Sequence, residues 1–110
     1  MFVIQRKMVV QKGYADKVVE QFSQKGIIDE QDGLVDVTIM KKKARRAEEE
    51  EVIVLFRWES EEDWKNWEKS DAHIEAHKAK RGQPKPEYII SVENERYEVQ
   101  AVKKANETHV

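Results

Sequence analysis

One stretch of the chain, residues 57–81, contains all three tryptophans and two of the three histidines. Indole rings have large burial energies but pack in specific geometries, so three of them in one stretch exceed what a small core needs. Imidazole side chains can ligate metals and exchange protons near neutral pH. The density of both side-chain types predicts a pocket for a flat, large or metal-bearing ligand.

The two histidines of this stretch, His73 and His77, are four residues apart, so on a helix they share a face. Two imidazoles on one face can ligate a single ion. However, the sequence HIEAH has its glutamate one position later than the HExxH zinc motif, and no third ligand stands out. We therefore interpret His73 as a partly exposed polar side chain rather than as a metal ligand.

A single neutral imidazole, in contrast, is enough to serve as the axial ligand of a haem iron. His77 suits that role better than His73, because the small alanines beside it let a flat macrocycle approach a helix. Trp67 precedes His77 by ten residues, which is about 15 Å along a continuous helix. A break at Ser70–Asp71 would instead fold both side chains back onto one cavity.

The first element that can position these groups is a strand over residues 2–10, where apolar side chains recur with period two. Its more apolar face carries Arg6. A buried guanidinium must be paired or must border a polar cavity, because leaving it unpaired costs several kcal/mol. In the opposite assignment Val3 and Val9 face the core and Arg6 is solvated, and the sequence leaves both assignments open.

The middle of the chain contains one further helix and two further strands. Residues 15–22 have the i, i+3, i+4, i+7 spacing of an amphipathic helix, with Gly26 as the expected C-terminal stop. Residues 34–40 alternate like a strand with one polar face, whereas residues 52–58 are apolar on both faces and predict a central strand. Between them, segment 41–51 places five basic residues before four acidic ones. We favour a solvated hairpin arm over a basic docking patch, because exposed opposite charges cancel.

The capping-box pattern of Ser60 with Asp63 predicts a helix through Trp67, and a second helix follows the break until the glycine and prolines after residue 81 end it. Residues 96–102 are the last expected strand. The order strand, helix, strand, strand, helix, strand predicts an α+β, ferredoxin-like antiparallel sheet. The doubly apolar central strand indicates that a second copy covers the other face, which predicts a homodimer.

The composition bounds the class of protein. The 110 residues predict a single domain over residues 1–104 and a flexible tail over 105–110. The net charge of −2 provides no field for nucleic acid or membranes, so neither is an expected partner. Cysteine is absent, which excludes disulfides and thiolate sites. No signal-peptide core or run of roughly 20 apolar residues occurs, so a soluble cytoplasmic protein is expected.

These motifs together resemble a known family. The resemblance includes a KG turn at residues 12–13, DGLVDV at 32–37, RWES at 57–60 and above all WEKSDAHIEAHK at 67–78. The chain is similar to the haem-degrading monooxygenases of the IsdG type, within the wider antibiotic-biosynthesis monooxygenase family of dimeric α+β barrels. The last motif is the specific one, since it reproduces the family's Trp, Lys-Ser-Asp and Ala-His-Lys with their spacing.

The resemblance implies that His77 is the proximal ligand of the haem iron. It also implies that Trp67 presses the porphyrin out of plane and so exposes a meso carbon to oxidation. The family's third pocket residue is an asparagine on the first strand, and counting back places Arg6 there. A guanidinium can pair a haem propionate or fill the distal site instead. Trp58 and Trp64 have no family role and are interpreted as core or interface packing.

The expected activity is oxidative cleavage of haem with dioxygen and an external reductant, which releases iron. Haem is then substrate and cofactor at once, and the electron donor is a further partner. Two alternatives stay open. One is a cofactor-independent monooxygenase of the same fold that oxidises small quinol-type molecules, and the other is a haem-binding protein without turnover, which Arg6 makes plausible.

Overall fold

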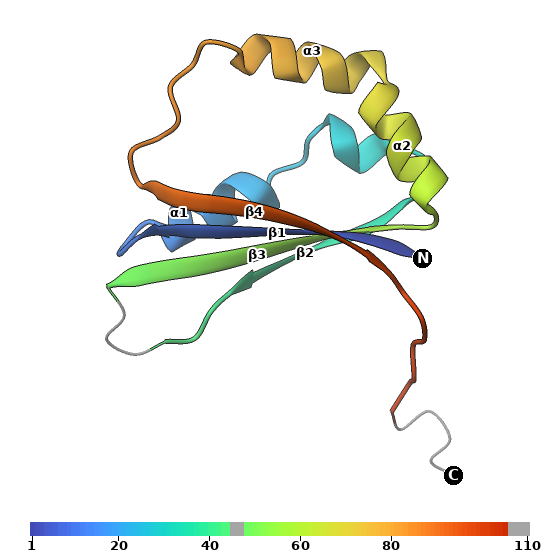
Figure 1. Cartoon of the computed structure of the whole chain (residues 1–110), viewed down its shortest axis with the longest axis horizontal. Coiled ribbons are helices and arrows are strands. Elements are labelled where there is room, and N and C mark those ends of the chain that lie inside the picture. The colour runs from blue at the N-terminus through green and yellow to red at the C-terminus, as the bar shows by residue number, and fades with distance from the viewer. Residues whose placement is uncertain (45–47, 106–110) are drawn as a thin grey trace.

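Residues 1–44 and 48–105 are described by the computed structural model, in which a four-stranded antiparallel sheet carries the helices on one face (Figure 1). The strand order is β2-β3-β1-β4, so β1 and β3 are central, and the ferredoxin-like prediction is confirmed. None of the helices described is long and apolar enough to cross a membrane. In chain order the elements are β1 (Phe2–Gln11), α1 (Ala15–Ser23), η1 (Ile27–Glu30), β2 (Leu34–Lys41), β3 (Glu49–Trp58), α2 (Glu61–Lys69), α3 (Asp71–Lys80) and β4 (Ile89–Glu98).

Strand β1 pairs with both of its neighbours, and this register decides which side chains face the helices. Arg6 lies opposite Val54 of β3 and Asn94 of β4. Ile4 and Arg6 lie on the same face as the buried Met8, which packs beneath α1. The assignment that turns Arg6 toward the helices is therefore the correct one of the two that the sequence allows.

The helix-covered face of the sheet has a packed half and an open half. Under α1 the side chains are almost fully buried, and each contributes about 1.5–3 kcal/mol relative to an exposed position if it is large. The other half lies beneath α2 and α3 and is not filled in this way (Figure 1). The buried core residues under α1 are Met8, Val10, Ala15, Val18, Val52 and Val54.

Two serines set the ends of α2 and α3. Ser60 Oγ accepts a hydrogen bond from the backbone N–H of Asp63 (3.1 Å), as the capping pattern predicts. Ser70 Oγ accepts from the backbone N–H of His73 (3.2 Å) and donates to the carbonyl of Trp67 (2.7 Å). One side chain thus ends α2 and begins α3, and the predicted break at this point is confirmed.

Strand β4 differs from its prediction, because it spans Ile89–Glu98 rather than residues 96–102. It lies at the edge of the sheet, and its helix-facing side carries Asn94 and Arg96 where an ordinary strand has apolar residues. The alternation of apolar and polar side chains that locates a strand is therefore missing from its second half.

Two smaller predictions are also wrong. Gly26 does not end α1, whose C-cap is Gln24; it precedes η1 and donates its backbone N–H to the carboxylate of Asp29 (2.6 Å). The alternation in residues 34–40 groups Val35 with Val37 and Ile39, but the register with β3 shifts between Leu34 and Asp36, and Val35 is exposed.

The charged segment 41–51 forms the end of β2 and the start of β3 in its described residues. Lys41 Nζ lies 3.1 Å from the carboxylate of Asp16 on α1, an exposed ion pair. Residues 45–47 of the predicted arm lie outside the described part of the chain, as do residues 106–110 of the predicted tail.

Glu50 reaches from β3 to the N-terminus of α1. Its carboxylate accepts hydrogen bonds from the backbone N–H groups of Gly13 (2.6 Å) and Ala15 (3.2 Å). These donors, that of Ala15 first, hold the pKa of Glu50 below its ordinary value. The N-cap residue Tyr14 makes no side-chain cap of its own, and Glu50 instead satisfies the N–H of Ala15, the first residue of the helix.

Candidate functional site

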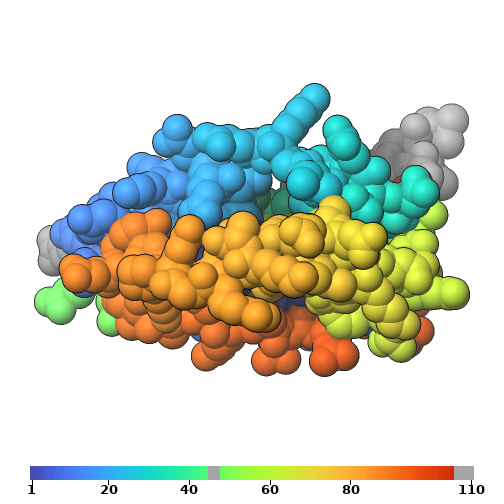
Figure 2. Space-filling model, turned by 90° about the horizontal axis from the view of Figure 1, so that it is seen from above, coloured from blue at the N-terminus to red at the C-terminus, as the bar shows by residue number. Residues whose placement is uncertain are grey.

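A cavity of about 700 Å³ lies between the open half of the sheet and the arm formed by α2 and α3. Figure 2 looks down on the helices and shows α3 running beside α1 and η1, with a narrow gap between them. The three site residues predicted from the sequence, Arg6, Trp67 and His77, all line this cavity. The fold therefore brings together side chains that are up to 71 positions apart in the chain.

Trp67 and His77 belong to different helices and share the cavity because of the corner at Ser70. The ring of His73 lies between them: its centroid is 4.9 Å from that of Trp67 and 4.3 Å from that of His77, both edge to face. The His77 side chain is exposed in the single chain. Its imidazole is therefore available to a ligand that enters the cavity.

His73 is partly exposed, as predicted, but it also lines the cavity. Its side chain is 18% exposed, and its Nε2 lies 2.6 Å from Oε2 of Glu68 near the end of α2. Burial lowers the pKa of His73; the charge of Glu68 opposes this shift and His77 adds to it. The short distance between Nε2 of His73 and the Glu68 carboxylate makes Glu68 the polar neighbour of this ring.

Arg6 brings a positive charge into the floor of the cavity. Its guanidinium carbon is 5.9 Å from the centroid of the Phe22 ring, at the range of a cation–π contact. Its Nε is buried and has no hydrogen-bond partner among the described residues. Burial lowers the pKa of Arg6, yet a guanidinium remains protonated at neutral pH. The side chain thus brings a positive charge to the cavity, which favours an anionic group.

Of the other two tryptophans, Trp58 is buried in the core, as predicted, whereas Trp64 on α2 is half-buried, and both line the cavity. Trp58 is 1% exposed, and its Nε1 is a second buried donor without a hydrogen-bond partner in the described chain. The ring of Trp64 lies 5.4 Å from that of Phe2. One indole from β3 and one from α2 thereby give this part of the cavity an aromatic surface.

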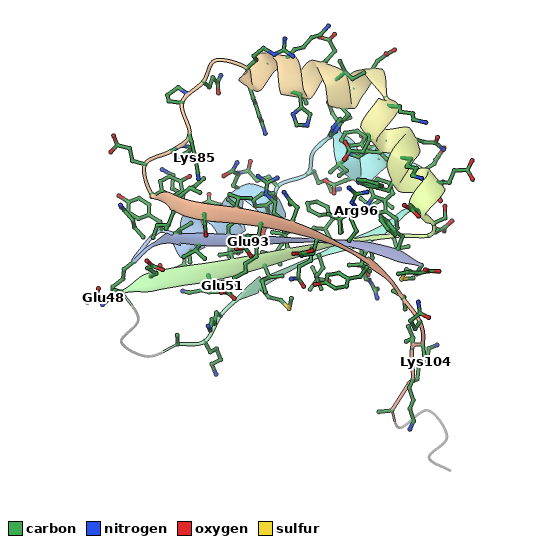
Figure 3. The ribbon with its side chains drawn as sticks, viewed as in Figure 1. Glu48, Glu51, Lys85, Glu93, Arg96 and Lys104 are labelled. Carbon is green, nitrogen blue, oxygen red and sulfur yellow. The ribbon has the colours of Figure 1, made fainter. Side chains whose placement is uncertain are left out.

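The contribution of β4 is absent from the sequence-based prediction. Asn94 lies directly across from Arg6 and lines the cavity. The guanidinium of Arg96 lies 5.2 Å from the Trp64 ring, and Figure 3 shows Arg96 on the helix side of the sheet, beneath α2. Alternate residues of a strand share a face, so counting on in steps of two from Val92, which packs against the core, reaches both Asn94 and Arg96. This spacing is the sequence signal that could have identified them.

Comparisons with known proteins point to one family. The sequence model named antibiotic biosynthesis monooxygenase matches residues 1–79. The chain is 60% identical over 103 residues to the haem-degrading monooxygenase HmoA of Bacillus subtilis, covering 94% of each chain. It is 38% identical over 77 residues to the staphylobilin-producing haem oxygenase of Staphylococcus haemolyticus, covering 70% of this chain and 73% of the relative.

Solved structures share the fold. A Bacillus cereus protein assigned to the antibiotic biosynthesis monooxygenases superposes with a TM-score of 0.81 at 38% identity, covering 94% of this chain and 97% of that one. MhuD of Mycobacterium tuberculosis, solved with two haems in its active site, gives a TM-score of 0.67 at 17% identity, covering 94% and 100%. At that identity the second likeness concerns the fold alone.

Proposed function

The chain belongs to the antibiotic biosynthesis monooxygenase family, and we propose that it is a haem-degrading monooxygenase. The reaction opens the porphyrin of bound haem with dioxygen and electrons from an external donor, and it releases the iron. The observation that carries the proposal is that the corner at Ser70 brings Trp67 and His77 onto one cavity. HmoA, whose name gives haem as the molecule it degrades, is similar along 94% of the chain.

The residues of the cavity fit a haem. Its volume of about 700 Å³ lies within the roughly 300–1,000 Å³ of small-molecule and cofactor sites. The described residues contain no cluster of three or more side chains suited to a free metal ion. Haem brings its own porphyrin nitrogens, so the single imidazole of His77 is enough. The positive charge of Arg6, which lines the cavity, suits a carboxylate such as a haem propionate.

Each site residue then has a distinct task. Haem supplies the iron at which dioxygen is activated, and it is itself the molecule that is oxidised. His77 would hold that iron from α3 through its imidazole. Trp67 would contact the macrocycle from α2, and its bulk would restrict how the substrate sits in the cavity. Arg6 approaches from the floor of the cavity, where it pairs a propionate and orients the substrate.

A second candidate function is haem binding without turnover, and Arg6 is the observation that favours it. A guanidinium is larger than the asparagine of related enzymes and carries a charge. If it extends across the distal side rather than toward a propionate, it excludes dioxygen. The two candidates therefore differ in the direction of one side chain within the same cavity.

We further propose that the working unit is a homodimer in the cytoplasm. No helix or strand among residues 1–44 and 48–105 covers the sheet face opposite the helices, and this face carries apolar side chains on its central strands. The cytoplasm maintains the low potential from which an external electron donor is supplied.

Adding ascorbate in air to the complex with hemin separates the candidates. An enzyme bleaches the Soret band and delivers iron to a ferrous chelator, and the same sample without oxygen keeps its spectrum. A carrier keeps the Soret band in both samples. Absence of hemin binding would exclude both the haem-degrading enzyme and the haem carrier. It would favour the cofactor-independent oxidation of quinol-type molecules.

A further inference from the structure

Glu68 and His73 form a contact across the corner between α2 and α3. Glu68 is the residue after Trp67, and His73 lies in the first turn of α3. In a straight helix side chains three or four residues apart are neighbours, so the corner brings together two residues that a straight helix would not pair. Here Glu68 Oε2 and His73 Nε2 are 2.6 Å apart. The backbone N–H of His73 also donates to Ser70 Oγ (3.2 Å), so both the backbone and the side chain of His73 are held in place.

The ring of His73 is wedged between the two side chains that face the ligand. It contacts Trp67 at 4.9 Å and His77 at 4.3 Å between centroids, with interplanar angles of 73° and 62°. Edge-to-face contacts of this kind favour one relative orientation of the rings. The side chain is 18% exposed, so little solvent separates it from its neighbours.

An exposed histidine on a helix can rotate about its side-chain bonds, and this freedom is lost when it ligates an iron. A neighbour that holds the ring in the binding orientation reduces that entropic loss. Residues that orient a metal-binding histidine in this way typically change metal affinity by 10–100-fold when they are removed. Glu68 and His73 have the geometry for this role, although neither is itself placed as a ligand.

We propose that Glu68 and His73 are positioning residues: Glu68 anchors the His73 ring, and that ring sets the orientation of His77 and Trp67 toward the substrate. The inference rests on the proposed function, because it assumes that His77 binds the iron of haem. It goes beyond that function by assigning a role to two residues that neither bind the iron nor contact dioxygen.

The test uses three variants. His73→Ala removes the ring between Trp67 and His77. Glu68→Leu removes the carboxylate beside that ring, whereas Glu68→Gln keeps a hydrogen-bond acceptor there. Hemin is the probe. Two readouts are used: the dissociation constant from a Soret titration, and the iron–imidazole stretching band of the ferrous complex in resonance Raman spectra. Glu75→Ala is the matched control, because Glu75 also lies on α3 but forms only an exposed pair with Lys78 (3.9 Å).

We expect His73→Ala and Glu68→Leu each to weaken hemin binding about tenfold and to shift or broaden the iron–imidazole band. Glu68→Gln and Glu75→Ala should retain the wild-type band and an affinity within about twofold of the wild type. Circular dichroism confirms that each variant is folded. Wild-type affinity and band position in folded His73→Ala and Glu68→Leu overturn the inference, and so does an equal loss in Glu75→Ala.

The same experiment separates this inference from the proposed function. If the wild type binds no hemin, the proposed function fails. If the wild type binds hemin and His77→Ala does not, while His73→Ala behaves as the wild type, only the positioning role fails. Loss of imidazole ligation in His73→Ala together with its retention in His77→Ala would identify His73 as the ligand, and would overturn the positioning role and the assignment of His77 while leaving haem binding intact.

Discussion

The position of Arg6 favours the binding of an anionic ligand but destabilises the protein when no ligand is bound. Its Nε is buried without a partner among the described residues, and its guanidinium has only the face of Phe22 nearby. An unsatisfied buried donor costs about 1–3 kcal/mol, so the apo structure is less stable than its packing alone allows. A carboxylate of the substrate would remove that cost on binding, which couples stability to occupancy.

Replacing Arg6 with leucine should therefore stabilise the apo protein and weaken its substrate binding. We expect the free energy of unfolding to rise by about 1 kcal/mol, because the unpaired donor and charge are gone. Hemin affinity should fall about tenfold, the equivalent of one lost charge-assisted contact of roughly 1.5–3 kcal/mol. Chemical denaturation and a Soret titration measure the two effects. A variant that is less stable and binds hemin equally well would contradict this account of Arg6.

Single residues differ in how far the sequence predicts them. Trp67 and His77 stand in a motif with fixed spacing, and both line the cavity, whereas their roles toward haem stay predictions. The direction of Arg6 depends on strand register, which the residues of one strand do not determine. The pairing of His73 with Glu68 depends on the angle between two helices, and no local pattern encodes that angle.

At the scale of elements, the corner between α2 and α3 decides whether a site exists. Without it, Trp67 and His77 would lie about 15 Å apart along one helix axis. The corner is held by Ser70, whose hydroxyl bonds the carbonyl of Trp67 and the N–H of His73. A residue that touches no ligand thus fixes the relation between the two residues that do.

Ser70→Ala should reduce stability and also weaken hemin binding. Loss of an N-cap typically costs about 1 kcal/mol, and the freed corner lets Trp67 and His77 move apart. Ser60→Ala is the matched control, because Ser60 caps α2 with the same hydrogen bond (3.1 Å) but lies at its far end. It should lose similar stability and keep its hemin affinity. Equal weakening of hemin binding in the two variants would show that the corner has no special role.

Glu50 makes the attachment of α1 to the sheet dependent on pH. Its pKa is lowered in the folded state, so the unfolded chain takes up this proton first as acid is added. The stabilisation from Glu50 is therefore present above its ordinary value of 4.5 and is lost as the pH falls through the lower, folded value.

Glu50→Ala should lower the free energy of unfolding at neutral pH, and its difference from the wild type should shrink well below pH 4.5. Urea denaturation at several pH values measures both. Glu49→Ala, an exposed neighbour on the same strand, should show no such convergence. A difference between Glu50→Ala and the wild type that is constant with pH would exclude the carboxylate as its cause.

Elements are predicted best where a local chemical signal marks their ends. The serines at positions 60 and 70 predict both helix starts, because a cap requires an oxygen at that position. Strand β4 is predicted poorly, since its helix-facing residues serve the cavity rather than a core. Gly26 is misassigned because glycine allows a helix stop and an irregular connection equally well.

At the scale of the whole molecule, the sheet has two unequal faces. The face opposite the helices carries the ion pair of Lys7 with Glu51 (3.5 Å) and that of Arg57 with Asp36. Figure 3 shows Glu51 on this side. Between these polar pairs lie apolar side chains such as Leu55, half-buried in the single chain, and the more exposed Met40 (41%) and Tyr97 (49%). A second copy of the chain suits a face of this kind.

Leu55→Glu should convert the proposed homodimer into a monomer, because it places a charge at the centre of the face that the second copy covers. Light scattering coupled to gel filtration measures the mass, with twice the chain mass expected for the wild type. The control Ile27→Glu changes an exposed apolar residue of η1, on the helix side, and should leave the dimer intact. A monomeric wild type would contradict the proposed assembly.

The most direct test of the whole account is a hemin titration of the wild type beside His77→Ala, with Glu75→Ala as the control. We predict that the wild type and Glu75→Ala bind one hemin per chain with a saturating Soret change, because the cavity joins an exposed imidazole to an aromatic wall. His77→Ala should fold normally and lose the spectrum of imidazole-ligated haem. Wild-type protein that shows no saturable hemin binding, or His77→Ala with an unchanged spectrum, would contradict the assignment of this cavity as a haem site.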